Sequence, residues 1–488
     1  MAAIAALVVL VRLPVLLQSV AGTDEGLYAL VAREWLDGHL PYTTVWEAKP
    51  PLFFAILAAA MFLFGKTILA IRLVNDLAIA ATAAALYAIG TTLRRDGATI
   101  GFTAACFYAA MTISDSGLSA VAESFYAPFI ALVFAVVLGR SPAVSARPLC
   151  SLALGASLAA AVLVKESAAI EAAYAACVVV WYTGLAAAIP LALGFVSTLG
   201  LAIVPYAVTG HLAPFWDANV SSIARRAPIV VPDVAPRRSI VGSQLLAFFP
   251  ATLLAFGVPF FLGSRDTDAE LRRTIAIVLG WFVASVATVI SIREYLGNHF
   301  IGAMAPASLL AAIVVVHAAR RLRWQALVPA AIALAILAHA GYQFVVAAPV
   351  AFDRIRSGDV TYGDPSAELA RYLVAHRTAR EMLYVADDRT ALYLLADAEP
   401  PTRFAYPAHL LDRYQEAIAG VDGPLEIERI LATYPDYIVR DRANIPNEDP
   451  RGAALLNTAL RDRYRIVFAV GQRTIYLRDR IGMNAGVP

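Results

Sequence analysis

Charged side chains are scarce in this chain. Only 16% of its 488 residues are Asp, Glu, Lys or Arg, whereas 60% are hydrophobic, and the mean hydropathy is +0.67. A soluble globular chain is about a quarter charged and about half apolar. Most of this chain is therefore excluded from the water-soluble class and is predicted to lie in a membrane.

Lysine and cysteine are also rare. Only three of the 39 basic residues are lysine, namely Lys49, Lys66 and Lys165. The three cysteines lie inside apolar runs, which favours buried thiols over a disulfide frame or a metal knuckle. The net charge is +2, and no basic tract is interleaved with aromatic residues, so no nucleic-acid partner is predicted.

The few charges are unevenly placed. Half of them lie in residues 351–488, and the preceding part is largely runs of Ala, Leu, Val, Ile and Phe. We therefore predict a transmembrane domain over 1–350 and a soluble α/β domain over 351–488. In the second domain, the periodicity predicts helices at 367–376, 410–418 and 451–460, and strands at 382–386, 435–439, 465–470 and 474–477.

The membrane part is long enough for many spanning helices, each of which needs about 20 apolar residues. About 11 spans are predicted, near 2–20, 67–93, 98–113, 121–139, 149–164, 167–183, 185–209, 240–263, 274–291, 299–317 and 325–348. The apolar stretch Pro51–Phe64 is too short to cross and is predicted to be an interfacial or re-entrant helix.

The arginines set the predicted orientation. If 51–64 does not cross, most arginine-rich loops fall on one side, which the positive-inside rule makes cytoplasmic. The sequence thus predicts a multi-pass protein of a bacterial inner membrane, with an internal N-terminus and with residues 351–488 on the periplasmic or extracellular face.

Two of the predicted outer loops are long, 21–50 and 209–239. The first contains an amphipathic segment, 24–36, that should lie on the membrane surface. The second carries four arginines against the topological trend: Arg225, Arg226, Arg237 and Arg238. They indicate either an anionic ligand or simply a long translocated loop, for which the charge rule is weak.

The first outer loop holds the most distinctive residues. Asp24 and Glu25 directly follow the first span, where they could cap the next helix or take part in chemistry. Further along, Lys49 stands before Pro50-Pro51, at the lip of the interfacial helix. A lysine in that place suits a lipid phosphate.

These motifs resemble those of the GT-C glycosyltransferases, most closely the protein O-mannosyltransferase-like family, which includes the lipid A aminoarabinose transferases. The likeness covers the membrane domain and the layout of the trailing domain. The residues that carry it are Asp24-Glu25-x-x-Tyr28, the 32–38 helix, Glu47-x-Lys49-Pro50-Pro51-Leu52, Gly65 and Arg72.

The resemblance implies a fold and an activity. The expected fold is a polytopic α-helical GT-C-like membrane protein with a C-terminal extracytoplasmic α/β domain. The expected activity moves a monosaccharide from a polyprenyl-phosphate donor in the lipid bilayer to an extracytoplasmic acceptor, which is a glycolipid, a polysaccharide or a protein.

The family's essential first-loop carboxylate falls on Asp24, with Glu25 beside it. A hydroxyl or amine acceptor must lose a proton as it attacks, so a carboxylate can serve as general base. A nearby anion also stabilises an anomeric carbon that becomes oxocarbenium-like. One direct displacement would invert the configuration.

The leaving lipid phosphate needs fixed cations. The candidates are Lys49, Lys165, Arg293 and His299. Two purely structural alternatives stay open: an ion pair between Lys165 and its neighbour Glu166, and a surface ion pair between Arg293 and Glu294.

Five further residues are predicted to line the substrate pocket: Tyr28, Trp46, Glu47, Glu123 and Tyr295. Glu123 stands where the family has an acidic residue, usually Asp before a small residue and Pro, and helix capping is its alternative role. No cofactor is required. A divalent metal ion at Asp24 and Glu123 is left open, because the spacing shows no ligand signature.

Two other classes compete with a transferase. A transporter or lipid flippase would use the same acids for ion coupling, and it predicts ionisable groups near mid-span and symmetric halves. A membrane scaffold would only present the trailing domain. The polar candidates cluster at outer span ends and no internal repeat is present, which favours the transferase. The sequence names neither the sugar nor the acceptor.

Overall fold

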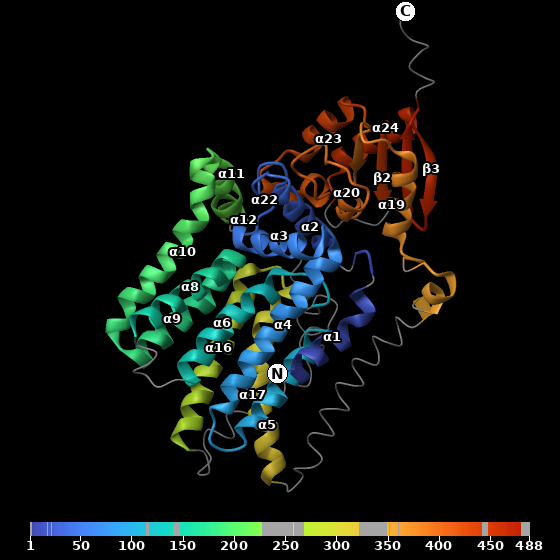
Figure 1. Ribbon diagram of the computed structural model, residues 1–488. Helices are drawn as coiled ribbons and strands as arrows, with labels where there is room; N and C mark the ends of the chain where they lie inside the picture. The colour runs from blue at the N-terminus through green and yellow to red at the C-terminus, as the bar shows by residue number, and fades with distance from the viewer. Residues whose placement is uncertain are drawn as a thin grey trace, which may run out of the picture.

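The structure is a computed structural model that describes residues 2–16, 18–20, 22–113, 117–139, 147–226, 257, 268–321, 349–350, 352–359, 361–441 and 448–479. Within these ranges, helices form a bundle up to residue 321, and a small sheet with its own helices follows beyond residue 364 (Figure 1).

The bundle is built from apolar helices. Its members are α1 (Ala2–Leu16), α4 (Ile68–Thr91), α5 (Gly97–Met111), α6 (Ala122–Gly139), α8 (Pro148–Val164), α9 (Ala169–Thr183), α10 (Ala188–Val208), α16 (Ala269–Ile292) and α17 (Ile301–Arg321). In the described part of the chain, five helical segments are long and apolar enough to cross a membrane: Ile68–Thr91, Ala122–Gly139, Leu185–Val208, Ala269–Ile292 and Gly297–Arg320. The spans predicted at 240–263 and 325–348 lie outside the described residues, so the count of about 11 stays a prediction.

Small residues let the helices approach closely, as they do in membrane bundles. A Cβ atom on Gly155 of α8 would lie 1.9 Å from the Leu191 carbonyl oxygen of α10. The reverse contact is equally tight, since a Cβ on Gly194 of α10 would lie 2.0 Å from the Leu152 carbonyl oxygen. Any side chain at either glycine would force these two helices apart.

The short apolar stretch forms a helix of its own, α3 (Pro51–Phe64), with the predicted bounds. Proline is favoured at its first position, and Gly65 ends it with a φ of 93°. Together with α2 (Thr23–Leu36), α3 lies between the bundle and the C-terminal part (Figure 1). Its interfacial placement stays a prediction.

The C-terminal part contains a four-stranded sheet in the order β1-β2-β4-β3. The strands are β1 (Leu383–Val385), β2 (Tyr437–Asp441), β3 (Tyr464–Val470) and β4 (Arg473–Arg478). β1 and β2 are parallel, and β4 is antiparallel to both β2 and β3. Strands therefore occur at all four predicted places, and the last two form the predicted pair.

Helices surround this sheet: α19 (Pro365–His376), α20 (Ala391–Leu395), α21 (Ala408–Leu411), α22 (Arg413–Ala419), α23 (Gly423–Ala432) and α24 (Pro450–Arg463). The single helix predicted at 410–418 is wrong. It is broken at Asp412, whose backbone is extended. Its carboxylate accepts hydrogen bonds from the backbone N–H groups of Tyr414 and Gln415 at 2.8 and 3.2 Å and so caps α22. The sequence also did not predict α20 and α23.

The loop 21–50, predicted to be the first outer loop, contributes two residues to the C-terminal core. Trp46 and Ala48 are buried in one hydrophobic cluster with Tyr384, Phe404 and Leu410. The loop thus joins the two parts of the chain, and this junction positions the candidate site.

Candidate active site

Asp24 lies in the first turn of α2. The N-cap residue, Gly22, makes no side-chain cap hydrogen bond, and both Asp24 and Glu25 lie in the first turn, where acids suit a helix N-terminus. The Asp24 carboxylate is half-buried and accepts a hydrogen bond from the Tyr28 hydroxyl at 3.4 Å. Burial raises the pKa of Asp24, Lys49 partly opposes the shift, and the negative charge of Glu123 adds to it. The result is a carboxylate more basic than usual.

Glu25 points elsewhere, although it is the next residue. Its two carboxylate oxygens accept hydrogen bonds from Nε and Nη2 of Arg72 on α4, at 2.8 and 2.6 Å. The Ala120 N–H donates to the same carboxylate at 3.3 Å, and Glu25 is only 1% exposed. Both oxygens are therefore engaged in a closed ion pair.

The second half of the first loop places a cation beside Asp24. The Lys49 ammonium lies 3.3 Å from Glu47 Oε1 and 5.9 Å from the centre of the Tyr28 ring. Burial lowers the pKa of Lys49, but the charges of Glu47 and Glu166 outweigh it, and the net pKa is raised. Lys49 thus stays charged at neutral pH.

Glu123, Lys165 and His299 meet at the ends of three helices. The Lys165 ammonium donates a hydrogen bond to Glu123 Oε1, and both residues are buried. The same oxygen accepts from the Asn298 amide at 3.0 Å, and His299 Nε2 lies 3.9 Å from it. Lys165 is thus paired with Glu123 rather than with its neighbour Glu166.

The long second loop supplies a cation that the sequence had marked only as one of four arginines. Arg226, at the end of α12 (Ser222–Arg226), has Nη1 3.7 Å from Glu166 Oε1. Burial lowers the pKa of Arg226, but the negative charges of Glu294 and Glu166 raise it by more, so the net shift is upward. Arg237 and Arg238 lie outside the described residues.

Glu294 and Tyr414 close this side of the cluster. The Tyr414 hydroxyl donates to Glu294 Oε1 at 2.8 Å, and His299 Nε2 lies 4.0 Å from Glu294 Oε2. Neither Glu294 nor Tyr414 was predicted as a site residue. Glu294 stands inside the loosely matching stretch 292–300, whereas Tyr414 had no signal in the sequence.

Three predicted residues lie at the edge of this arrangement. Arg293 is exposed at the C-terminal end of α16, with a φ of 64°, and Tyr295 is half-buried with a φ of 53°. Trp46 is 1% exposed, and its indole N–H donates to Asp217 Oδ2 at 3.0 Å. Trp46 therefore fastens the loop, because its ring is enclosed by protein.

Electrostatic interactions join these groups into one cluster. Lys49, Glu123 and Glu294 all act on the charge of Asp24, although they come from different segments of the chain. Such a cluster of carboxylates and ammonium or guanidinium groups can take up a proton and hold an anion side by side. Among the described residues, no group of three His, Cys, Asp or Glu side chains is arranged to hold a metal ion.

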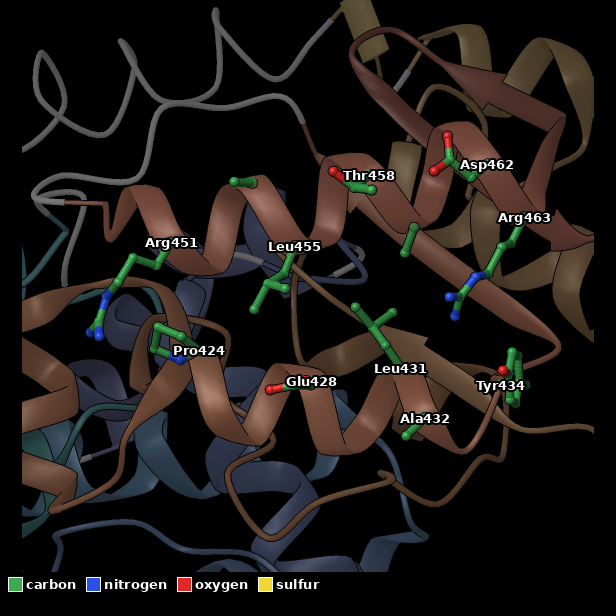
Figure 2. Close-up of a pocket in the computed structure, with 12 residues that line it drawn as sticks. Pro424, Glu428, Leu431, Ala432, Tyr434, Arg451, Leu455, Thr458, Asp462 and Arg463 are labelled. Carbon is green, nitrogen blue, oxygen red and sulfur yellow. The ribbon is translucent and has the colours of Figure 1, made fainter.

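Two cavities lie outside this cluster. One, of about 440 Å³, is lined by Tyr42, Thr43, His211, Ala213, Pro214, Asp217 and Arg403, next to the hydrogen bond between Trp46 and Asp217. The other, of about 740 Å³, is a groove between α23 and α24. Figure 2 shows Arg451 and Arg463 toward its two ends, with Leu431 and Leu455 between them. None of the residues predicted as site residues lines either cavity.

The architecture is similar to that of known solved structures. No protein-family model matches the chain, and no curated protein matches it in sequence. Among solved structures, ArnT from Cupriavidus metallidurans bound to undecaprenyl phosphate is similar, with a TM-score of 0.66 and 16% identity over 98% of this chain and 97% of that chain. The apo state of the same ArnT gives a TM-score of 0.62 and 13% identity over the same shares of both chains.

A weaker likeness is to the Archaeoglobus fulgidus oligosaccharyltransferase tethered with an acceptor peptide, with a TM-score of 0.49, 11% identity, and coverage of 89% of this chain and 68% of that chain. The two ArnT structures show that this chain has the ArnT fold over nearly its whole length.

Proposed function

We propose that this protein is a glycosyltransferase that moves a monosaccharide from a polyprenyl-phosphate donor to an extracytoplasmic acceptor. The observation that carries the proposal is a half-buried carboxylate, Asp24, that interacts with the charge of Lys49 in one electrostatic cluster. The fold supports it, because ArnT has the same fold and has been seen with undecaprenyl phosphate.

Asp24 is the proposed general base. Its carboxylate accepts a hydrogen bond from the Tyr28 hydroxyl, and its raised pKa makes it a better proton acceptor than an ordinary aspartate. Glu25 does not share this role in the proposal. Both of its oxygens are bound by Arg72, so an acceptor hydroxyl could reach them only by breaking that ion pair.

Lys49 is the proposed main contact for the donor phosphate, and Arg226 is the second. Both cations lie close to carboxylates, Glu47 and Glu166, that hold them in place when no phosphate is bound. Lys165 and His299 serve in the proposal as a second layer, because Glu123 already neutralises the lysine charge. Arg293 is exposed and stays the least supported of the phosphate candidates.

The proposed reaction is a single displacement. An acceptor hydroxyl or amine attacks the anomeric carbon and gives its proton to Asp24, while the bond between that carbon and the phosphate oxygen breaks. The lipid phosphate leaves with the electron pair, and the nearby cations stabilise its charge. Attack opposite the leaving group inverts the configuration at the anomeric carbon.

The proposal places the site on the extracytoplasmic side, as the arginine distribution predicts. The acceptor class is a glycolipid, a polysaccharide or a protein side chain. The C-terminal part, residues 351–488, would stand on the same side as the acceptor.

The decisive experiment incubates the purified protein with a panel of polyprenyl-phosphate monosaccharides and measures the release of free polyprenyl phosphate. Release with at least one sugar, and none with Asp24→Asn, is the expected result. Release at the wild-type rate in Asp24→Asn would remove the general-base assignment. No release with any donor and acceptor tried would count against the transferase as a whole.

A further inference from the structure

The first outer loop is anchored to the C-terminal part at Trp46. Its backbone N–H donates to the Arg403 carbonyl oxygen at 2.7 Å, and its indole ring meets the His409 ring edge-on, with centroids 4.9 Å apart. The Asp217 hydrogen bond holds the other end of the indole. Residues 403–409 are thus fixed against the loop that carries the candidate site.

His409 passes this contact on to Tyr406. The two rings meet edge-on at 5.1 Å, and the His409 backbone N–H donates to the Tyr406 carbonyl oxygen at 2.9 Å. Burial, with the positive charge of Lys49, lowers the pKa of His409 to about 3. A neutral ring between Trp46 and Tyr406 therefore acts as a packing wedge that sets the position of the phenol.

A second contact fixes the distance between the C-terminal part and α2. A Cβ atom on Gly26 would lie 2.5 Å from the backbone nitrogen of Ala391. About two turns further along α2, the buried Arg33 donates to the Tyr393 and Ala398 carbonyl oxygens at 3.2 and 3.0 Å. These contacts bring α20 directly against α2, the helix that carries Asp24 in its first turn.

The Tyr406 hydroxyl reaches Asp24 as a result. It interacts with the charges of Asp24 and Glu47, which places the phenol beside the Asp24 carboxylate. Tyr28 donates to the same carboxylate from within α2. Asp24 therefore has one phenol beside it from each part of the chain. Burial, Asp24 and Glu47 raise the pKa of Tyr406 far above its usual value, so its proton stays in place at neutral pH.

We propose that Tyr406 is a positioning residue of the active site, donating a hydrogen bond that orients the Asp24 carboxylate toward the acceptor, so that the C-terminal part completes the site. This inference rests on the proposed function for the identity of the acceptor step. It gives residues 389–409 a role in the reaction itself, beyond holding or shaping a soluble domain.

The placement has a chemical consequence. A carboxylate that accepts hydrogen bonds from two phenols presents its remaining lone pairs in a fixed direction. A larger fraction of such carboxylates is then oriented productively for proton transfer. Removing one phenol hydroxyl leaves the base present but less well oriented. The effect should therefore fall on kcat rather than on the KM for the donor.

The test compares Tyr406→Phe with Tyr437→Phe in the purified full-length protein. The Tyr437 hydroxyl donates to the His376 carbonyl oxygen at 3.1 Å within the C-terminal part, so the control removes a phenol hydroxyl that is bonded to a backbone carbonyl. Tyr406→Phe should lower kcat about 10-fold, as expected for a lost hydrogen bond to a charged group, and should leave the KM for the donor within about 2-fold. Tyr437→Phe should change neither.

The pH profile gives a second readout. A donated hydrogen bond stabilises the charged carboxylate, so its loss should move the acid limb of kcat/KM to higher pH. An unchanged kcat and an unchanged acid limb in Tyr406→Phe would overturn the proposal, and the transferase assignment would stand.

A third measurement is independent of turnover. Infrared difference spectra can follow the Asp24 carboxyl group, identified by its loss in Asp24→Asn, through a pH titration. The midpoint should rise in Tyr406→Phe and stay in place in Tyr437→Phe. If the wild-type protein used no polyprenyl-phosphate donor, the proposed function would fail, and this titration would still decide whether Tyr406 is bound to Asp24. An equal Asp24 titration midpoint in Tyr406→Phe and Tyr437→Phe would refute the hydrogen bond between Tyr406 and Asp24.

Discussion

Glu25 and Arg72 form a bidentate ion pair, with hydrogen bonds of 2.8 and 2.6 Å, in which the two side chains are 0% and 1% exposed. This pair joins the start of α2 to the first third of α4. It explains why two adjacent carboxylates have different environments. Glu25 holds α2 on the bundle, and Asp24, one residue earlier, is left facing the cluster around Lys49.

Removing Arg72 should therefore destabilise the protein more than removing an exposed arginine. Arg72→Met leaves the buried Glu25 charge without its partner, a change that typically costs about 3–5 kcal/mol. The matched control is Arg94→Met, because Arg94 is paired with Glu270 at 3.1 Å on the surface, where an ion pair contributes about 0–1 kcal/mol. Thermal unfolding in detergent should show a large fall for the first variant only. Similar unfolding temperatures would mean that the Glu25–Arg72 pair does not hold α2.

Asp24→Asn should abolish transfer and leave expression and donor binding nearly intact. The amide keeps the shape of the side chain but cannot take a proton, and loss of a general base lowers rates by about 100- to 10,000-fold. Free carrier release reports the rate, and retention of a labelled donor reports binding. Loss of donor binding together with the rate would assign Asp24 to the donor site instead.

The pH dependence follows from the raised pKa of Asp24. The base must be ionised, so activity should rise with pH through a midpoint above the ordinary range of an aspartate. Stability should change in the opposite sense. A carboxyl group with a higher pKa in the folded state binds its proton more tightly there, so its contribution favours folding at low pH and is lost as pH rises through the folded value. Asp24→Asn should thus raise the unfolding temperature slightly near pH 7, and a lower one would contradict this account.

Lys49→Ala should weaken use of the donor by about 1–3 kcal/mol, the usual cost of losing a contact with a charged group. Lys66→Ala is the control. Lys66 is exposed and paired with Asp37 just past the end of α3, and it carries no proposed role. The KM for the donor, measured for both variants, should rise in the first and stay unchanged in the second. A normal KM in Lys49→Ala would shift the main phosphate contact to Arg226.

Gly26→Ala should lower both stability and activity. The added methyl group would lie 2.5 Å from the Ala391 nitrogen and 2.6 Å from its Cβ, and a backbone atom cannot move aside cheaply. Overpacking of this kind costs about 1–3 kcal/mol. Gly200→Ala, on a face of α10 with no atom within 4 Å, should be neutral or slightly stabilising. Unfolding temperature and carrier release together test the junction between the two parts of the chain.

Much of the architecture could be predicted because it depends on local pattern. The apolar runs mark the helices, and the Pro-Pro corner with Gly65 sets both ends of α3, since proline suits a helix start and a glycine at positive φ suits its end. Alternating apolar residues mark β3 and β4. Short segments escaped this reasoning: α20 has five residues, too few for a helical period to be visible.

The site could be predicted only in part. The sequence by itself determined the chemistry present in the first outer loop, namely adjacent carboxylates followed by a lysine at a proline corner, because residue types and their spacing are local. Only the tertiary structure decided which groups act together. Glu25 pairs with Arg72, and Lys165 pairs with Glu123. A buried charge is stabilised by whichever opposite charge lies closest in space, whatever their separation along the chain. For the same reason Arg226, Tyr406 and Tyr414 reach the cluster from segments far along the chain, which no spacing in the sequence could show.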